Sequence, residues 1–177
     1  MPLGDRETRR IPHLAKIEGE FLEEILPVRG FATLTTPRRV TKSELDSLYA
    51  RWIVGLQAHH RVTLGWIRSI ELNPSPHIHV VLVAAVPMDC AYAVILWSQI
   101  AAPRYLEAAR VEPYKRGLCG LGYVLKQLGN ATSEPQFSDN IQAFASGSGE
   151  SHFRTSSAQK RQIRRIKVQL AEPIGVQ

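Results

Sequence analysis

The chain has 177 residues, 44% of them hydrophobic, and these values suit one globular domain with a sizeable core. Its formal net charge of +6 favours a polyanionic partner such as nucleic acid, because basic side chains release counterions from a phosphate backbone. Two cysteines are too few for a disulfide framework and the N-terminal residues are too charged for a signal peptide, so we expect a cytoplasmic protein.

The first part of the chain alternates between helical and strand patterns. Residues 12–26 carry apolar side chains at helical spacing, which predicts a helix. A short β-rich run follows and ends before Pro37. If it forms a strand, Phe31, Thr33 and Thr35 share one of its faces.

A second helix and a hairpin are predicted next. Thr41 and Glu44 form the S/T-x-x-E capping box that begins helices, and the helix should run to about His59. Residues 61–72 and 77–86 are both β-rich, and the separator "NPSP" has strong turn chemistry. The two runs therefore predict an antiparallel hairpin.

The longest apolar stretch covers residues 79–97. Pro87 and Asp89 interrupt it, so it indicates a strand followed by a helix over residues 88–101, and not a membrane span.

Two further elements complete the predicted fold. Residues 109–115 favour a short edge strand, and residues 116–129 have leucines at helical spacing with Gly129 as a C-cap. The resulting order, with a central antiparallel hairpin, predicts an α+β fold with an antiparallel central sheet and flanking helices. A ferredoxin-like arrangement is compatible with this order.

The composition changes after residue 130. The following residues are rich in Ser, Gly and small polar side chains, which predicts an irregular segment. We therefore expect a domain over residues 1–130 and a polar linker with a basic C-terminal segment over residues 131–177. The basic residues that could contact phosphates there are Lys160, Arg161, Arg164 and Arg165.

The stretch "PHIHVVLV" holds the first candidate site. Side chains alternate along a strand, so His77 and His79 share one face while Ile78 lies on the other. Two such imidazoles can begin a divalent-metal site, and Glu71 across the tight turn could supply a carboxylate. The alternative is that the two histidines simply form a polar face.

The stretch "GLGYVLKQ" holds the second candidate. Tyr123 and Lys126 lie at i and i+3 and so share a helix face. Beside a metal that polarises a phosphoryl oxygen, a tyrosine can attack phosphorus and form a covalent phosphotyrosine. Alone, Tyr-x-x-Lys is common and is compatible with a purely structural role.

Three short stretches, "FATLTT", "PHIHVVL" and "YVLK", resemble the three motifs of rolling-circle replication initiators in order and rough spacing. These proteins belong to the HUH endonucleases, named for histidine-hydrophobic-histidine. The resemblance covers about residues 30–129.

The resemblance implies a role for each matching residue. His77 and His79 would be paired ligands of Mn²⁺ or Mg²⁺, with Glu71 as the acidic third ligand. Tyr123 would cleave one DNA strand and keep the 5′ phosphate. Lys126 would help to position the metal or the scissile phosphate.

Other residues are expected on the DNA-binding side. In the first motif we expect Thr33 or Thr35 near the substrate and Phe31 in the core. The arginines that could line this side are Arg38, Arg39, Arg51, Arg61 and Arg68.

The leading hypothesis is therefore a metal-dependent nickase that initiates rolling-circle replication, for example of a plasmid. Its substrate would be single-stranded or hairpin origin DNA, and its 3′ hydroxyl product would prime a host polymerase. The chain has no P-loop motif, so unwinding would fall to a host helicase or to supercoiling. A transposase or relaxase with single-tyrosine chemistry, a non-catalytic nucleic-acid-binding module and a structural domain remain alternatives.

Overall fold

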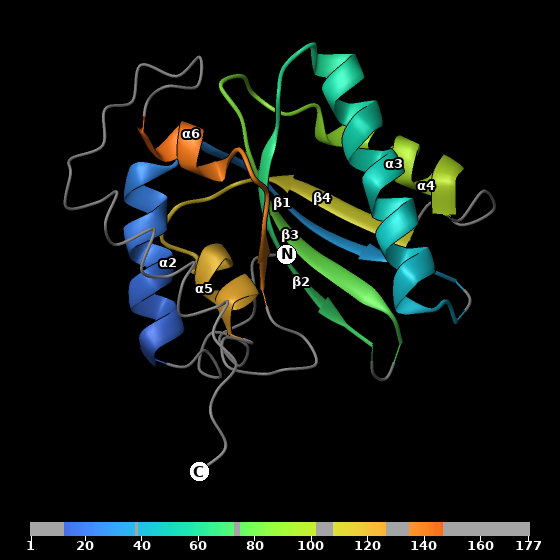
Figure 1. Ribbon diagram of the computed structural model, residues 1–177, viewed down its shortest axis with the longest axis horizontal. Helices are drawn as coiled ribbons and strands as arrows, with labels where there is room; N and C mark the ends of the chain where they lie inside the picture. The colour runs from blue at the N-terminus through green and yellow to red at the C-terminus, as the bar shows by residue number, and fades with distance from the viewer. Residues whose placement is uncertain (1–12, 38, 73–74, 102–107, 127–134, 147–177) are drawn as a thin grey trace.

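A computed structural model describes residues 13–37, 39–72, 75–101, 108–126 and 135–146 of the chain. In this part, a five-stranded antiparallel sheet lies between two groups of helices (Figure 1). The predicted α+β class, with an antiparallel central sheet and flanking helices, is confirmed.

The centre of the fold is a β-α-β-β-α-β unit. Its elements are β1 (Val28–Thr35), α3 (Lys42–His60), β2 (Gly65–Glu71), β3 (His77–Val83), α4 (Cys90–Ala101) and β4 (Ala109–Pro113). The strand order is β4-β1-β3-β2-β5, which places β4 at an edge as predicted and gives the first four strands the ferredoxin-like order. The predicted hairpin is the β2–β3 pair.

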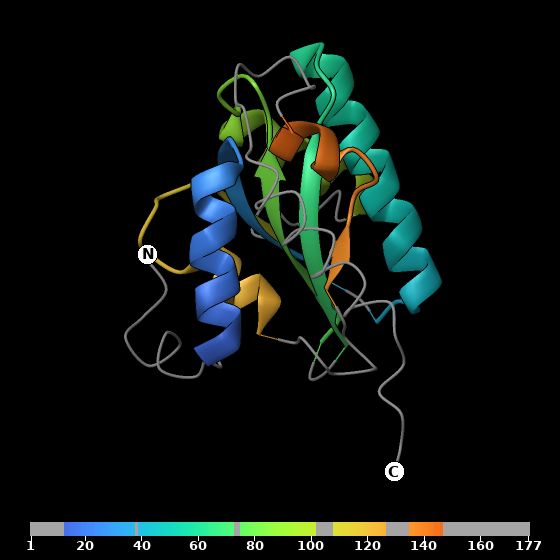
Figure 2. The ribbon, with the colours of Figure 1, turned by 60° about the vertical axis from the view of Figure 1, so that its left-hand side comes forward.

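The remaining elements are α2 (His13–Ile25), α5 (Gly120–Leu125), β5 (Gln136–Phe137) and α6 (Ile141–Ser146). Helices α2, α5 and α6 cover one face of the sheet, and α3 and α4 cover the other (Figures 1 and 2). The two faces therefore have separate hydrophobic cores.

The capping box at the start of α3 forms as predicted. The Glu44 N–H donates to the Thr41 hydroxyl, and the Thr41 N–H donates to the Glu44 carboxylate at 2.8 Å. These bonds provide acceptors for two backbone N–H groups at the start of the helix, where no carbonyl of the helix can accept them.

The alternation of β3 decides which side chains meet which helices. Ile78, Val80 and Leu82 are fully buried against α3 and α4, whereas Val81 and Val83 are buried toward α2, α5 and α6. The two histidines at the start of β3 alternate with Ile78 and so lie on the α5 side. A helix thus covers the face on which the candidate metal ligands lie.

The expected irregular segment after residue 130 contains ordered structure. Residues 135–146 form β5, which pairs with β2, and α6, whose Ile141 and Phe144 are buried. The Asn140 side chain also donates to the Leu64 carbonyl at 2.8 Å. Residues 135–146 therefore pack on the sheet, because a few well-spaced apolar residues anchor a segment whose average composition is polar.

Candidate metal centre

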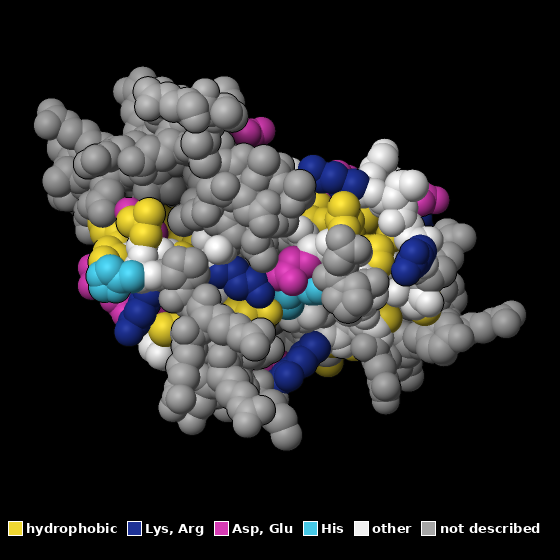
Figure 3. All heavy atoms as spheres, turned by 90° about the horizontal axis from the view of Figure 1, so that it is seen from below, with side chains coloured by type: hydrophobic (Ala, Val, Ile, Leu, Met, Phe, Trp, Pro, Cys, Tyr) yellow, Lys and Arg dark blue, Asp and Glu magenta, His cyan; other side chains and the backbone are white. Residues whose placement is uncertain are grey.

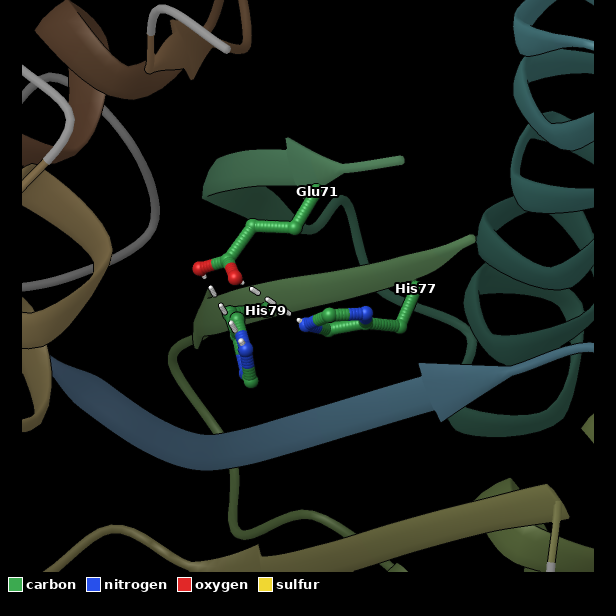
Figure 4. Close-up of side chains that lie close together, drawn as sticks. All are labelled: Glu71, His77 and His79. Carbon is green, nitrogen blue, oxygen red and sulfur yellow. Dashed lines mark ion pairs between the residues drawn. The ribbon is translucent and has the colours of Figure 1, made fainter. Parts of the chain in front are cut away.

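Glu71, His77 and His79 meet where the β2–β3 hairpin closes. The register pairs Glu71 directly with His77, and His79 follows two residues later on the same face. Each residue offers one ligand atom, and these three atoms lie within 4.8 Å of one another. In Figure 4 the Glu71 side chain reaches from β2 toward both imidazoles on β3. This group could hold a metal ion.

The electrostatics of the group favour a cation. A hydrogen bond from His77, followed by contacts with Lys126, holds the pKa of Glu71 down to about 2. Burial, and then the neighbouring charge of His77, lowers the pKa of His79 to about 3. At neutral pH the group therefore combines a carboxylate with a neutral His79 imidazole, a donor set that suits a divalent metal.

Helix α5 places Tyr123 and Lys126 beside this group. The Tyr123 ring meets the His79 ring edge-on, with centroids 4.8 Å apart. The Lys126 ammonium lies 3.6 Å from the Tyr123 ring centroid and 2.9 Å from Glu71 Oε1. Tyr123 in α5 and Lys126 at its C-cap thus lie on one side, as their i, i+3 spacing predicts, and contact His79 and Glu71. Tyr123 is only 9% exposed.

A backbone-to-backbone crossing seats α5 against α2. A Cβ added to Gly19 would lie 2.5 Å from the Gly122 nitrogen, closer than real Cβ contacts allow. Only glycine at position 19 therefore permits this approach. Because Gly122 precedes Tyr123, the crossing helps to set the position of the candidate nucleophile.

A buried hydrogen-bond chain fixes the start of α5. The Tyr114 hydroxyl donates to the Glu23 carboxylate and accepts from the Leu121 N–H at 3.1 Å. The other Glu23 oxygen accepts from the Gly117 N–H at 3.2 Å. Tyr114, which lies outside the third motif, thus links α2 to the loop before α5.

Helix α5 is shorter than the predicted helix over residues 116–129. It begins at Gly120, because Cys119 has a left-handed φ of 55° that a helix interior does not accommodate. Leu118, counted among the leucines at helical spacing, lies before the helix and is exposed. The predicted C-cap, Gly129, lies outside the described residues.

We expect Tyr114→Phe to lower the free energy of unfolding by about 1–3 kcal/mol, because it removes a partner of a buried carboxylate and of a helix N–H. Denaturant unfolding measures the loss, and hydrogen exchange at the Leu121 amide should become faster. Tyr92→Phe, at a half-buried tyrosine of α4, is the control. Equal stability of the Tyr114 variant and the wild type would contradict the role of this chain.

The two threonines of the first motif lie on the histidine side of β1 but have different partners. Thr33 Oγ1 lies 3.1 Å from His79 Nδ1, whereas the Thr35 hydroxyl donates to the Ala108 carbonyl at 2.8 Å. Phe31, predicted to be core, packs against the α2–α5 core and stacks on the His79 ring.

The structure describes only some of the basic residues that were expected to contact DNA. Arg39 is exposed, and Arg51 and Arg61 are exposed on or beside α3. Arg38 lies outside the described residues, as do the C-terminal candidates Lys160, Arg161, Arg164 and Arg165. Figure 3 shows basic, acidic and histidine side chains together at the centre of the face seen from below.

Arg68 does not belong on the predicted DNA-facing side. It is buried, its guanidinium lies 4.3 Å from the Tyr49 ring centroid, and it pairs with Asp46 of α3 at 2.6 Å. Alternation along β2 places it on the face opposite Glu71. Its role is to pack α3 against the sheet.

Acidification should destabilise the metal-free protein through this centre. The folded pKa values of Glu71 and His79 lie below their unfolded values of 4.5 and 6.5, so unfolding takes up protons as the pH falls from 6.5 toward 2. The raised pKa of His77, due first to its hydrogen bond with Glu71, acts in the opposite direction and stabilises at low pH. We expect the unfolding free energy to fall between pH 6.5 and 3.

Denaturant titrations after EDTA treatment measure this dependence, and the variant His79→Gln should show a weaker one, because its amide does not titrate. The prediction is wrong if both proteins lose stability equally over this range.

Comparison with known proteins gives no relative: no protein-family model, curated protein or solved structure matches the chain. None of the described helices has the length and apolar character needed to cross a membrane.

Proposed function

We propose that this protein is a metal-dependent nickase that cleaves one DNA strand to initiate rolling-circle replication. The observation that carries the proposal is the convergence of Tyr123 and Lys126 from α5 on the Glu71, His77 and His79 group of β2 and β3. A hydroxyl nucleophile, a cation and a candidate metal centre in contact are the groups that phosphoryl transfer needs.

The proposed ion is Mn²⁺ or Mg²⁺, which Glu71, His77 and His79 would hold and which when bound would polarise a phosphoryl oxygen. The Tyr123 oxygen attacks phosphorus, the bond from phosphorus to the 3′ oxygen breaks, and the 5′ phosphate stays on the tyrosine. The phenol gives up one proton to solvent and the departing 3′ oxygen takes up one, so the step is balanced. Lys126 stabilises the negative charge that develops on the phosphoryl group.

The charge of Lys126 supports this role. Although burial disfavours its ammonium form, hydrogen bonds with Tyr123 and Glu71 raise the pKa of Lys126. The ammonium therefore persists at neutral pH between the nucleophile and the ligand carboxylate. The 3′ hydroxyl product could prime a host polymerase, with a host helicase unwinding the duplex.

The test is a covalent-adduct assay. Single-stranded and hairpin oligonucleotide pools labelled at their 3′ ends are incubated with the protein and Mn²⁺, then separated on a denaturing gel. We expect a shifted band that carries the label, that EDTA prevents, and that Tyr123→Phe lacks. The control Tyr92→Phe should form the adduct as the wild type does.

Binding of these pools without any adduct would contradict the nickase and favour a non-catalytic nucleic-acid-binding module. A transposase or relaxase would give the same adduct, and its preferred DNA sequence would separate it from a replication initiator.

A further inference from the structure

The hydroxyl of Thr33 is directed at a ring nitrogen of a candidate metal ligand. Strand β1 pairs with β3 so that Thr33 lies opposite His79, and Thr33 Oγ1 lies 3.1 Å from His79 Nδ1. Thr35 lies opposite His77 in the same register, yet its hydroxyl donates to the Ala108 carbonyl. Two threonines on one face of one strand therefore have different hydrogen-bond partners.

The other ring nitrogen of His79 faces the ligand group. His79 is 6% exposed, and within the described part of the chain its Nε2 makes no hydrogen bond. The nearest ion-pair partner of Nε2 is Glu71 Oε1 at 3.8 Å, which is too long for a hydrogen bond. A proton on Nε2 would thus be buried with no acceptor at hydrogen-bond distance, which is unfavourable.

A proton on Nδ1 avoids this cost, because Thr33 Oγ1 can accept it. The same arrangement exists at His77, whose Nδ1 lies 2.8 Å from the Ser75 carbonyl. A carbonyl can only accept, so the His77 proton must be on Nδ1 when that bond forms. Both imidazoles thus direct Nε2 toward Glu71: in the metal-free protein His77 Nε2 donates to that carboxylate, and a bound metal would displace this proton.

Packing alone cannot choose which ring edge of His79 faces the ligands. Phe31 stacks on the ring with an interplanar angle of 19°, and Tyr123 meets it edge-on at 87°. These contacts fix the plane of the imidazole, but a half-turn about its side-chain bond preserves that plane. The hydrogen bond to Thr33 distinguishes the two orientations.

We propose that Thr33 is a positioning residue of the metal centre, whose hydroxyl accepts the Nδ1 proton of His79 and keeps Nε2 available for the metal. This role rests on the metal centre of the proposed function and differs from the substrate contact predicted for Thr33. In the first motif, "FATLTT", the first threonine then helps to orient a metal ligand.

Metal affinity tests the role without any DNA. Loss of an outer-shell partner typically weakens metal binding roughly 10- to 100-fold, so we expect Thr33→Val to raise the Kd for Mn²⁺ by that factor in calorimetric titrations. Thr33→Ser keeps a hydroxyl and should restore most of the affinity. Thr35→Val is the matched control, and its Kd should equal that of the wild type.

The tautomer of His79 tests the role directly in the wild-type protein. Long-range ¹H–¹⁵N spectra of the EDTA-treated protein should show a protonated Nδ1 and an unprotonated Nε2, and Thr33→Val should reduce this preference. A wild-type His79 protonated at Nε2, or an unchanged Mn²⁺ affinity in Thr33→Val, would overturn the proposal. Neither readout depends on nicking, so a failed adduct assay would disprove the nickase while leaving the role of Thr33 standing.

Discussion

His79→Ala is expected to abolish specific Mn²⁺ binding and covalent adduct formation together. The substitution removes one of the three ligand atoms that lie within 4.8 Å of one another. Losing an outer-shell partner already weakens a metal site roughly 10- to 100-fold, and losing a ligand should weaken it more. Calorimetric titration with Mn²⁺ measures the first effect, and the denaturing gel measures the second.

The variant should remain folded, because among the described residues His79 makes one side-chain hydrogen bond, and its removal also removes the cost of burying an imidazole. Thermal unfolding of the EDTA-treated protein checks this. His60→Ala, at the end of α3, is the control and should bind Mn²⁺ normally. Wild-type Mn²⁺ affinity in a folded His79→Ala protein would show that this group is not the metal centre.

The second large effect is expected for Gly19→Ala. The new Cβ would lie 2.5 Å from the Gly122 nitrogen and 2.9 Å from its Cα, and backbone atoms cannot rotate away as a side chain can. Helices α2 and α5 must therefore separate, and overpacking of this kind costs about 1–3 kcal/mol. Tyr123 would move with α5, so adduct formation should fall further than stability alone explains.

Gly30→Ala is the matched control, because a Cβ at this position would meet only ordinary contacts of 3.5 Å or more. Denaturant unfolding of both variants separates the effect of crowding from that of adding a methyl group. If Gly19→Ala unfolds at the same denaturant concentration as the wild type, the backbone crossing is not what positions α5.

Local patterns were sufficient to predict the hairpin and the pairing of the candidate ligands Glu71 and His77. The "NPSP" turn and the alternation of β3 placed Glu71 beside His77, and the register shows them directly paired. The capping box at Thr41 likewise predicted where α3 begins. These features depend on residues that are close in sequence, so local sequence patterns are enough to predict them.

The contacts that hold α5 against α2 could not be predicted from local patterns. Glu23 and Tyr114 are 91 residues apart, and their hydrogen bond exists only once α2 packs beside the loop before α5. The close approach of Gly19 to Gly122 likewise exists only once α2 and α5 pack together. Neither glycine lies in a turn, and nothing in the neighbouring sequence indicates a helix crossing.

The two threonines of β1 show the same limit within one motif. Alternation places Thr33 and Thr35 on one face, but only the tertiary partners distinguish a hydroxyl at a His79 nitrogen from one at the Ala108 carbonyl. Sequence reasoning therefore expected a substrate contact from either one. The signal for a separate role was the pairing of β1 with β3, which the strand pattern does not reveal.

The most direct test of the central claim is to identify the residue that carries DNA. The adduct formed with Mn²⁺ is digested with nuclease and trypsin, and the peptides are sequenced by mass spectrometry. We expect a nucleotide joined through its 5′ phosphate to Tyr123, in the tryptic peptide 117–126, and no such peptide from His79→Ala. Attachment to Tyr92 or Tyr114, or a Tyr123 adduct that still forms when EDTA is present from the start, would contradict a tyrosine nucleophile acting at this metal centre.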